Sequence, residues 1–245
     1  MLAGDWDGIL DRAGIAGVGE SSLNTAILCV ALRSLSDVCR LQHDGALADR
    51  LDAWARELLE ALGEAFANGA FLRGYTDAGT PIGKPPDDPV FTNVQAWAIL
   101  ARAGTVSQRQ LALDTILTAC GESPLRLLTI PYPGSLPDEL SSHAVRPGYG
   151  ANAGVGLMEA AWFIQALAME DRVPEALAAY TRLCLRRRAA GNSPPAFPSI
   201  AWSGRLNGPA AQRQALFPEP DWAFEPPPQA YAVAWQEAVL RCITG

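Results

Sequence analysis

Apolar residues recur at helical spacing in pairs of segments, and long stretches rich in proline and glycine separate one pair from the next. Such pairs predict antiparallel helical hairpins, and the long loops are more typical of a hairpin array or toroid than of a plain bundle. The sequence therefore predicts an all-α fold whose loops gather at one end. The expected helices cover residues 22–41 with 45–66, 94–103 with 106–120, 154–169 with 174–188, and finally 230–243.

Composition indicates one globular domain over residues 1–245. Hydrophobic residues make up 49% of the chain and charged residues 18%, which is far from the composition of disordered proteins. The net charge is -7, and Lys84 is the only lysine. Because there is no basic field to attract a phosphate backbone, we expect no nucleic-acid partner.

The cysteines and histidines give no sign of a metal site. Five cysteines occur singly in apolar helical stretches, which favours reduced core thiols in a cytoplasmic protein. Only His43 and His143 are present, and no helix carries two ligands four residues apart. The N-terminus lacks the basic and apolar regions of a signal peptide, and we expect no membrane-spanning segment.

The loops contain aromatic, carboxylate and amide side chains, which suit sugars because rings stack on a pyranose and polar groups take its hydroxyls. Six short segments in order resemble the C-terminal half of the helical catalytic domain of glycoside hydrolase family 94, the inverting cellobiose, chitobiose and cyclic β-glucan phosphorylases. The segments that carry this resemblance read GDWDGIL, GVGESS, FLRGYTDAGTPIG, FTNVQAWAIL, RLLTIPYP and RPGYGANAG.

The resemblance implies an (α/α)6 toroid, of which this chain would form an incomplete part built of helical hairpins with long loops at one end. It also implies a reaction in which inorganic phosphate, as co-substrate, attacks the anomeric carbon of a β-linked oligosaccharide. A carboxylic acid protonates the leaving oxygen, and no protein base is required because phosphate takes the place of water. No other cofactor is expected.

The matched segments supply the candidate sugar-binding residues, and several have a simpler structural alternative. Asp5 and Asp7 could cap a helix, and Glu20 could be a helix N-terminal charge. Gln95 is expected to face the site, whereas its neighbour Trp97 is expected in the core. The complete set of predicted substrate-binding residues is Asp5, Asp7, Glu20, Arg73, Gln95, Tyr132 and Asn152.

The chain also departs from the family pattern. On this alignment we expect the general acid to lie outside the chain, and Met158 occupies the position of a phosphate-contacting histidine. Methionine cannot donate a hydrogen bond to phosphate. A Thr-Gly pair that precedes the family's last helix is not visible before Tyr231. We therefore assign no catalytic residue.

Two functions remain open on these grounds. One is a truncated or split phosphorylase that is inactive as a lone chain, with its remaining half supplied by a partner chain. The other is a pseudoenzyme that serves as a non-catalytic carbohydrate-binding or protein-interaction module. An incomplete ring exposes apolar hairpin flanks, so in either case we expect either a rearrangement into a compact bundle or pairing with a missing-half partner or, as a homo-oligomer, with a second copy.

Overall fold

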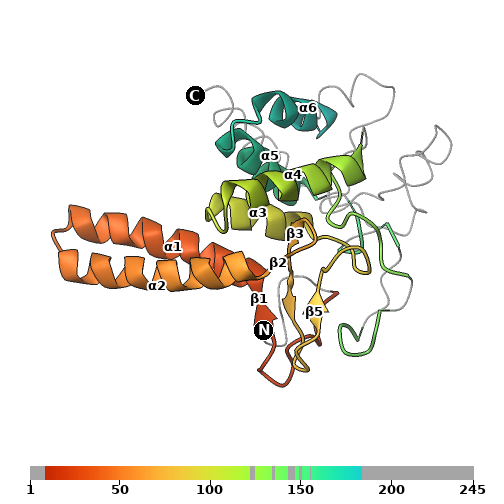
Figure 1. The fold of residues 1–245 in the computed structure, drawn as a ribbon, viewed down its shortest axis with the longest axis horizontal. Coiled ribbons are helices and arrows are strands. Elements are labelled where there is room, and N and C mark those ends of the chain that lie inside the picture. Colours follow the sequence, from red (N-terminus) through yellow and green to blue (C-terminus); the bar gives the residue numbers. More distant parts are fainter. Residues whose placement is uncertain are drawn as a thin grey trace, which may run out of the picture.

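The computed structural model describes residues 9–121, 125–133, 136–142, 147–148, 151–154 and 156–183. Figure 1 shows that this part of the chain is mainly helical, which confirms the prediction of an all-α fold. The expected helix at 230–243 lies outside the described residues. The helices are α1 (Ser22–Leu41), α2 (Gly45–Glu64), α3 (Thr92–Leu100), α4 (Val106–Cys120), α5 (Leu157–Met169) and α6 (Val173–Leu183).

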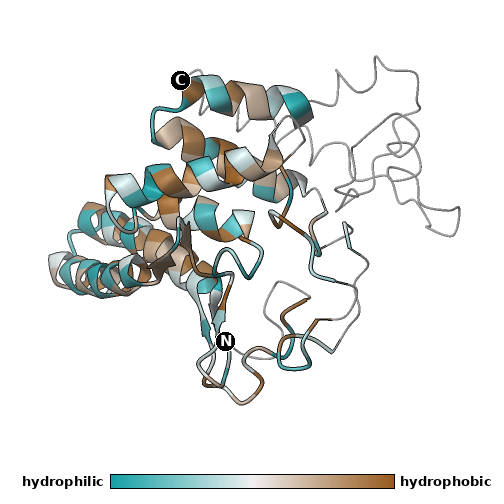
Figure 2. Cartoon of the chain, turned by 45° about the vertical axis from the view of Figure 1, so that its right-hand side comes forward, coloured by the Kyte–Doolittle hydropathy of each residue, from teal (hydrophilic) through white to brown (hydrophobic). Residues whose placement is uncertain are grey.

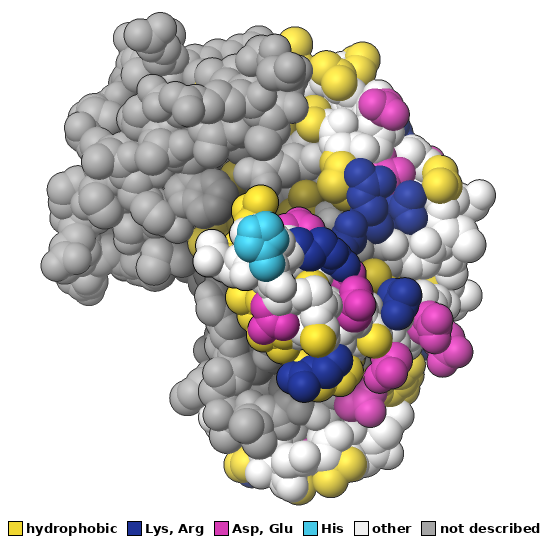
Figure 3. All heavy atoms as spheres, turned by 90° about the vertical axis from the view of Figure 1, so that its left-hand side faces the viewer, with side chains coloured by type: hydrophobic (Ala, Val, Ile, Leu, Met, Phe, Trp, Pro, Cys, Tyr) yellow, Lys and Arg dark blue, Asp and Glu magenta, His cyan; other side chains and the backbone are white. Residues whose placement is uncertain are grey.

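Helices α1 and α2 form an antiparallel hairpin that projects from the rest of the molecule (Figure 1). Side chains cap both starts: Ser21 accepts from the Asn24 amide, and Asp44 accepts from the Leu47 amide. Cys39, Ala48 and Leu51 pack between the two helices near the tip. Figure 3 looks onto this projecting end, where acidic and basic side chains are interspersed. No single charge sign dominates the part of this face that is described.

Five short strands occupy the segment between the first two hairpins and the turn before α1. Strands β1 (Glu20–Ser21), β4 (Gly74–Tyr75) and β5 (Pro81–Ile82) form an antiparallel sheet in the order β1-β4-β5. In it Glu20 pairs with Tyr75, and Tyr75 pairs with Pro81. Strands β2 (Phe66–Ala67) and β3 (Ala70–Phe71) form a separate two-stranded hairpin.

Helix α3 lies at the centre of the core. It packs against α1, α4 and α5, and seven of its nine residues are buried. This burial on every side explains why the segment is apolar all round rather than amphipathic. Figure 2 shows hydrophobic residues concentrated where these helices meet. The described helices thus form successive hairpins along the chain. The closure of these hairpins into a toroid stays a prediction.

The thiols and helix α1 bear on the expected cellular location. Cys29, Cys39 and Cys120 are buried free thiols, as predicted, and burial raises the pKa of Cys29. By length and composition alone, α1 is apolar enough to cross a bilayer, a test that core helices of soluble proteins also pass. Its Arg33 donates to the Ala101 carbonyl at 3.2 Å, which fastens the middle of α1 to the end of α3. The absence of a membrane span stays a prediction.

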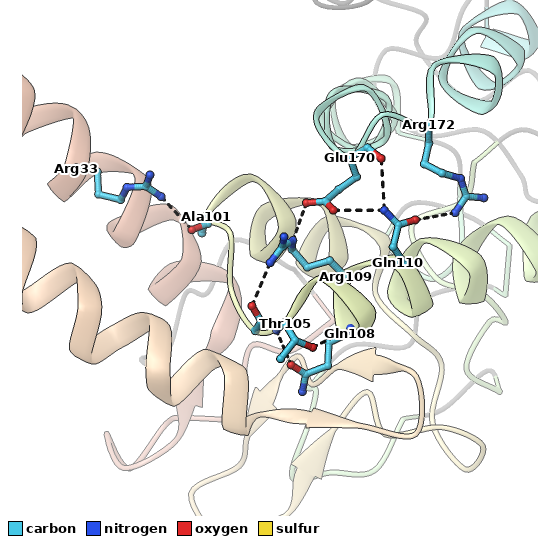
Figure 4. Close-up of polar contacts among 9 residues, drawn as sticks. Arg33, Ala101, Thr105, Gln108, Arg109, Gln110, Glu170 and Arg172 are labelled. Atoms are coloured by element: carbon cyan, nitrogen blue, oxygen red, sulfur yellow. Dashed lines mark hydrogen bonds and ion pairs between the residues drawn. The ribbon is translucent and has the colours of Figure 1, made fainter.

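A buried polar network joins α4 to the turn between α5 and α6 (Figure 4). The Arg109 Nε atom donates to Glu170 at 2.6 Å, and both side chains are at most 10% exposed. Gln110 also donates to Glu170 and accepts from Arg172 at 3.2 Å. A capping box of Thr105 and Gln108 fixes the start of α4 one turn earlier. The third hairpin is therefore held to the second by charge-assisted bonds.

We expect Arg109→Met to destabilise the fold by about 3 kcal/mol or more, because it leaves the Glu170 carboxylate buried without its cation. The double variant Arg109→Met with Glu170→Met should recover much of this loss, since it removes both buried charges. Urea unfolding measures both. Arg40→Met is a suitable control, because the ion pairs of Arg40 lie at the surface. Equal losses for the single and double variants would contradict a buried pair.

Candidate functional site

The GVGESS and RGYTD segments lie side by side through the pairing of β1 with β4, in which Glu20 is opposite Tyr75. The Asp77 carboxylate, in the second segment, holds the backbone that leads into β1 in place. It accepts hydrogen bonds from the amides of Ala16, Val18 and Gly19 at 2.7–2.9 Å. These donors lower the pKa of Asp77. Two motifs that sequence reasoning treated separately are therefore parts of one structural unit.

Gly19 is required at this junction by close backbone contact. A Cβ atom added there would lie 2.7 Å from the Ala13 carbonyl oxygen and 2.9 Å from that of Tyr75. Neither oxygen belongs to a flexible side chain, so a larger residue would force the strands apart. The glycine thus allows Glu20, the next residue, to begin β1 directly beside Tyr75.

A cavity of about 500 Å³ opens where β1 and β4 meet the base of the α1–α2 hairpin. Its volume lies in the range usual for small-molecule sites. Glu20 and Glu64 contribute carboxylates, Ser22 and Thr25 contribute hydroxyls, and Tyr75 contributes an aromatic ring. Its described lining contains no lysine or arginine. This combination can accept hydrogen bonds from hydroxyl groups and donate to them, and its two carboxylates disfavour an anionic ligand.

Glu20 is the predicted site residue that the structure places on this cavity. Glu64 was not predicted from the sequence, although a signal was present. It is the last residue of α2, where a negative charge opposes the helix dipole. An acidic side chain at that end weakens the helix slightly, which favours a role outside helix stability.

Arg73 is not among the lining residues of the cavity, but it bonds to one of them, Ser21. It is fully buried, and its Nη1 atom donates to the Ser21 Oγ atom at 2.8 Å. Its guanidinium also lies over the Phe91 ring, 5.8 Å from the centroid. Since Ser21 lines the cavity, Arg73 supports the cavity wall and connects it to the start of α3.

Gln95, which its motif predicts to face the site, does not line the cavity at Glu20. It is fully buried, and its Oε1 atom accepts from the Phe71 amide at 2.8 Å. Its Nε2 atom donates to the carbonyl of Phe71 at 2.8 Å and to that of Phe91 at 3.3 Å. The side chain thus pairs with β3 as a neighbouring strand would. Its donor and acceptor groups are used inside the protein.

Tyr132 and Asn152 form a similar pair in the later loops. The Asn152 Oδ1 atom accepts from the Tyr132 amide at 2.7 Å, and its Nδ2 atom donates to the Tyr132 carbonyl at 3.2 Å. Both residues are buried, and the Tyr132 ring lies 6.5 Å from that of Phe91. Arg73, Gln95 and Tyr132 therefore all contact Phe91, which sequence reasoning did not single out.

The remaining predictions have different outcomes. Asp5 and Asp7 lie outside the described residues. Trp97 packs in the core as expected. No group of three or more histidine, cysteine, aspartate or glutamate side chains within the described ranges could hold a metal ion.

Comparison with known proteins identifies the class. The model for the Glycosyl hydrolase 94 superfamily catalytic domain matches residues 1–186, so the chain belongs to this family. A 3-O-beta-D-glucopyranosyl-beta-D-glucuronide phosphorylase of Paenibacillus borealis is 34% identical over 140 residues, covering 55% of this chain and 18% of the relative. The cyclic beta-(1,2)-glucan synthase NdvB of Rhizobium meliloti (strain 1021) is 28% identical over 186 residues, covering 72% and 6%. The chain spans less than a fifth of either relative.

We expect Gln95→Met to destabilise the protein by roughly 2–4 kcal/mol, because the Phe71 amide and carbonyl lose their partners while buried. Chemical denaturation measures this loss. Gln42→Met provides a matched control, since Gln42 is exposed at the end of α1 and should change stability by less than about 0.5 kcal/mol. Similar values for the two variants would contradict the structural role given to Gln95.

Two aspartates should titrate in opposite directions from the ordinary value of 3.8. Backbone amides lower the pKa of Asp77, so its stabilisation is complete above the unfolded pKa and is lost as pH falls through the folded pKa, below 3.8. Burial raises the pKa of Asp88, which accepts from the Gly83 amide at 3.1 Å.

NMR titration of backbone amides tests this difference within one sample. The Ala16 and Gly19 signals should report a midpoint below 3.8, whereas the Gly83 signal should report one above it. Asp77→Asn should abolish the first transition and leave the second. A common midpoint for all three amides would be inconsistent with the two carboxylate environments.

Proposed function

We propose that this chain is a carbohydrate-binding part of a β-glycoside phosphorylase-like catalytic domain that does not carry out phosphorolysis by itself. Its membership of the Glycosyl hydrolase 94 superfamily over residues 1–186 is the observation that carries the proposal. The ligand is a β-linked oligosaccharide, and inorganic phosphate is the co-substrate only where a complete active site is assembled.

The cavity at Glu20 supports sugar binding. Carboxylates and hydroxyls on its wall can pair with sugar hydroxyls, while the Tyr75 ring offers a surface for an apolar pyranose face. Glu20 and Tyr75 lie on paired strands, and the hydroxyl groups lie at the capped start of α1. A ligand would therefore meet a largely preformed site, which reduces the entropy lost on binding.

The same cavity does not support phosphate binding. Phosphate sites usually rely on arginine or lysine, or on several convergent amides. The described lining carries two carboxylates and no cation, and the buried Arg73 is not part of it. These features favour a chain that binds a sugar without transferring its glycosyl group to phosphate.

Charge also favours a neutral sugar. The two relatives are named for a glucosyl glucuronide and a cyclic β-(1,2)-glucan. A uronate carboxylate placed near Glu20 and Glu64 would meet like charge, whereas an uncharged glucan would not. We therefore propose a neutral β-linked glucan segment as the ligand.

A second candidate is a split enzyme completed by another chain. Helix α1 exposes an apolar stripe of Leu28, Leu35 and Val38, each about half exposed. Their spacing places them on one face of the helix, as in a helix-packing seam. A missing-half partner or a second copy would bury this face. Light scattering on the purified chain measures the resulting assembly, and Leu35→Glu should reduce it.

Turnover and binding are tested separately on the full chain. With phosphate and either sophorose or laminaribiose, we expect no glucose 1-phosphate above a boiled control. Calorimetry with the same sugars should show saturable binding that Glu20→Gln and Glu64→Gln weaken several-fold. Asp138→Asn on a different loop is the control.

Release of glucose 1-phosphate would overturn the proposed inactivity. In that case Asp5→Asn and Asp7→Asn are the next variants, because inverting phosphorolysis needs one carboxylic acid and the GDWDG segment supplies two. Absence of both turnover and binding would overturn the proposed carbohydrate role of the lone chain.

A further inference from the structure

Two polar atoms on α3 are buried without a hydrogen-bond partner, Asn93 Oδ1 and Trp97 Nε1. Asn93 is only 2% exposed. Buried side-chain polar atoms nearly always have a partner, and an exception in a well-packed helix requires an explanation. The contrast with Gln95 is direct, because that neighbouring amide makes three hydrogen bonds to backbone.

The two atoms belong to one face of α3, since Asn93 and Trp97 are four residues apart. That face is directed toward α5. The Trp97 ring packs edge to face against Trp162, with centroids 5.2 Å apart at 64°. Met158 lies four residues before Trp162 on α5, just as Asn93 lies before Trp97. Hydrogen bonds from Thr92 to Leu127 and from Leu127 to Gly154 join the segments at the starts of α3 and α5, so Asn93 and Met158 lie toward the same end of the two helices.

This end of α3 adjoins the loops in which the sequence predicted a sugar site. The Thr92 amide donates to the Leu127 carbonyl at 2.9 Å, and the Leu127 amide donates to the Gly154 carbonyl at 2.8 Å. Asn93 is the next residue after Thr92. It is thus placed at the junction of the FTNVQ, RLLTIPYP and ANAG segments, although it does not line the cavity at Glu20.

The chemistry of the two atoms identifies what can satisfy them. An amide oxygen only accepts a hydrogen bond, and an indole N–H only donates one. Hydroxyl groups do both, because each has one donor and two acceptor positions. Neighbouring hydroxyls on a sugar ring therefore match this pair, whereas an ionised carboxylate offers no proton to Asn93.

We propose that Asn93 and Trp97 bind hydroxyl groups of the β-linked sugar at the loop end of the α3–α5 interface. This inference rests on the proposed carbohydrate function and adds a second contact region, separate from the cavity at Glu20. It replaces Gln95 with Asn93 as the amide of this motif that contacts the ligand. Trp97 serves both as a core residue through its ring and as a ligand contact through its N–H.

Two near-isosteric variants test the proposal. Asn93→Leu removes an unpaired buried polar group, so it should raise Tm in the absence of sugar, whereas Gln95→Met on the same helix should lower it. Asn93→Leu should also weaken sophorose or laminaribiose binding about tenfold, the effect of losing one good hydrogen bond. Trp97→Phe should weaken binding while leaving Glu20-dependent contacts in place.

The NMR signal of the Trp97 indole N–H distinguishes a ligand contact from a purely structural role, because only a ligand contact predicts a shift of this signal on sugar binding. The chain has seven tryptophans, and the indole signal missing from Trp97→Phe assigns Trp97. In the wild type this signal should shift with saturation by sophorose or laminaribiose. In Asn93→Leu the shift should occur only at correspondingly higher sugar concentration.

The outcomes separate this inference from the proposed function. Wild-type sugar binding with a stationary Trp97 signal and unchanged affinity in Asn93→Leu would overturn the inference and leave the function standing. The pair would then hold ordered water only. A lower Tm for Asn93→Leu would also overturn it, because Asn93 would be structural. No sugar binding by the wild type would overturn both.

Discussion

The side-chain amide of Gln95 is the interaction on which the loop end of this molecule depends. It forms with Phe71 the pair of hydrogen bonds that an adjacent strand would form, and its third bond reaches the Phe91 carbonyl. It thereby links β3, the turn before α3, and α3 itself. Phe91 in turn contacts Arg73 and Tyr132. Loss of this amide would loosen segments that are far apart in the sequence.

The motif residues accordingly divide into two groups with different physical roles. Arg73, Gln95 and Asn152 are fully buried; Arg73 bonds to Ser21, and the two amides bond to backbone groups. They hold the loops in position. Glu20 is exposed at the cavity, where a ligand can reach it. Such a division is physically reasonable, because a loop rich in glycine and proline can present a ligand-binding group reproducibly only when its own backbone is paired.

The sequence predicted α1 and α4 with their observed ends because strong caps coincide with apolar periodicity. Ser21 caps α1, and Thr105 forms a capping box with Gln108 at the start of α4. Helix α3 begins at Thr92, earlier than predicted, where the Thr92 hydroxyl donates to the Arg126 carbonyl. That contact is long-range and leaves no local signal. The bonds of Gln95 to Phe71 are also long-range, and a motif gives a position but not the partner of its side chain.

The buried Asn93 Oδ1 and Trp97 Nε1 atoms have no hydrogen-bond partner, whereas the Gln95 amide is fully bonded to backbone. A fold selected for stability alone would place an apolar side chain at position 93, because the surroundings are buried and provide no donor. Retaining an amide there lowers stability unless a ligand supplies the missing proton. Binding then restores the hydrogen bond and discriminates against molecules that lack a hydroxyl at that point. The same buried environment that makes the free chain less stable therefore makes the site more selective.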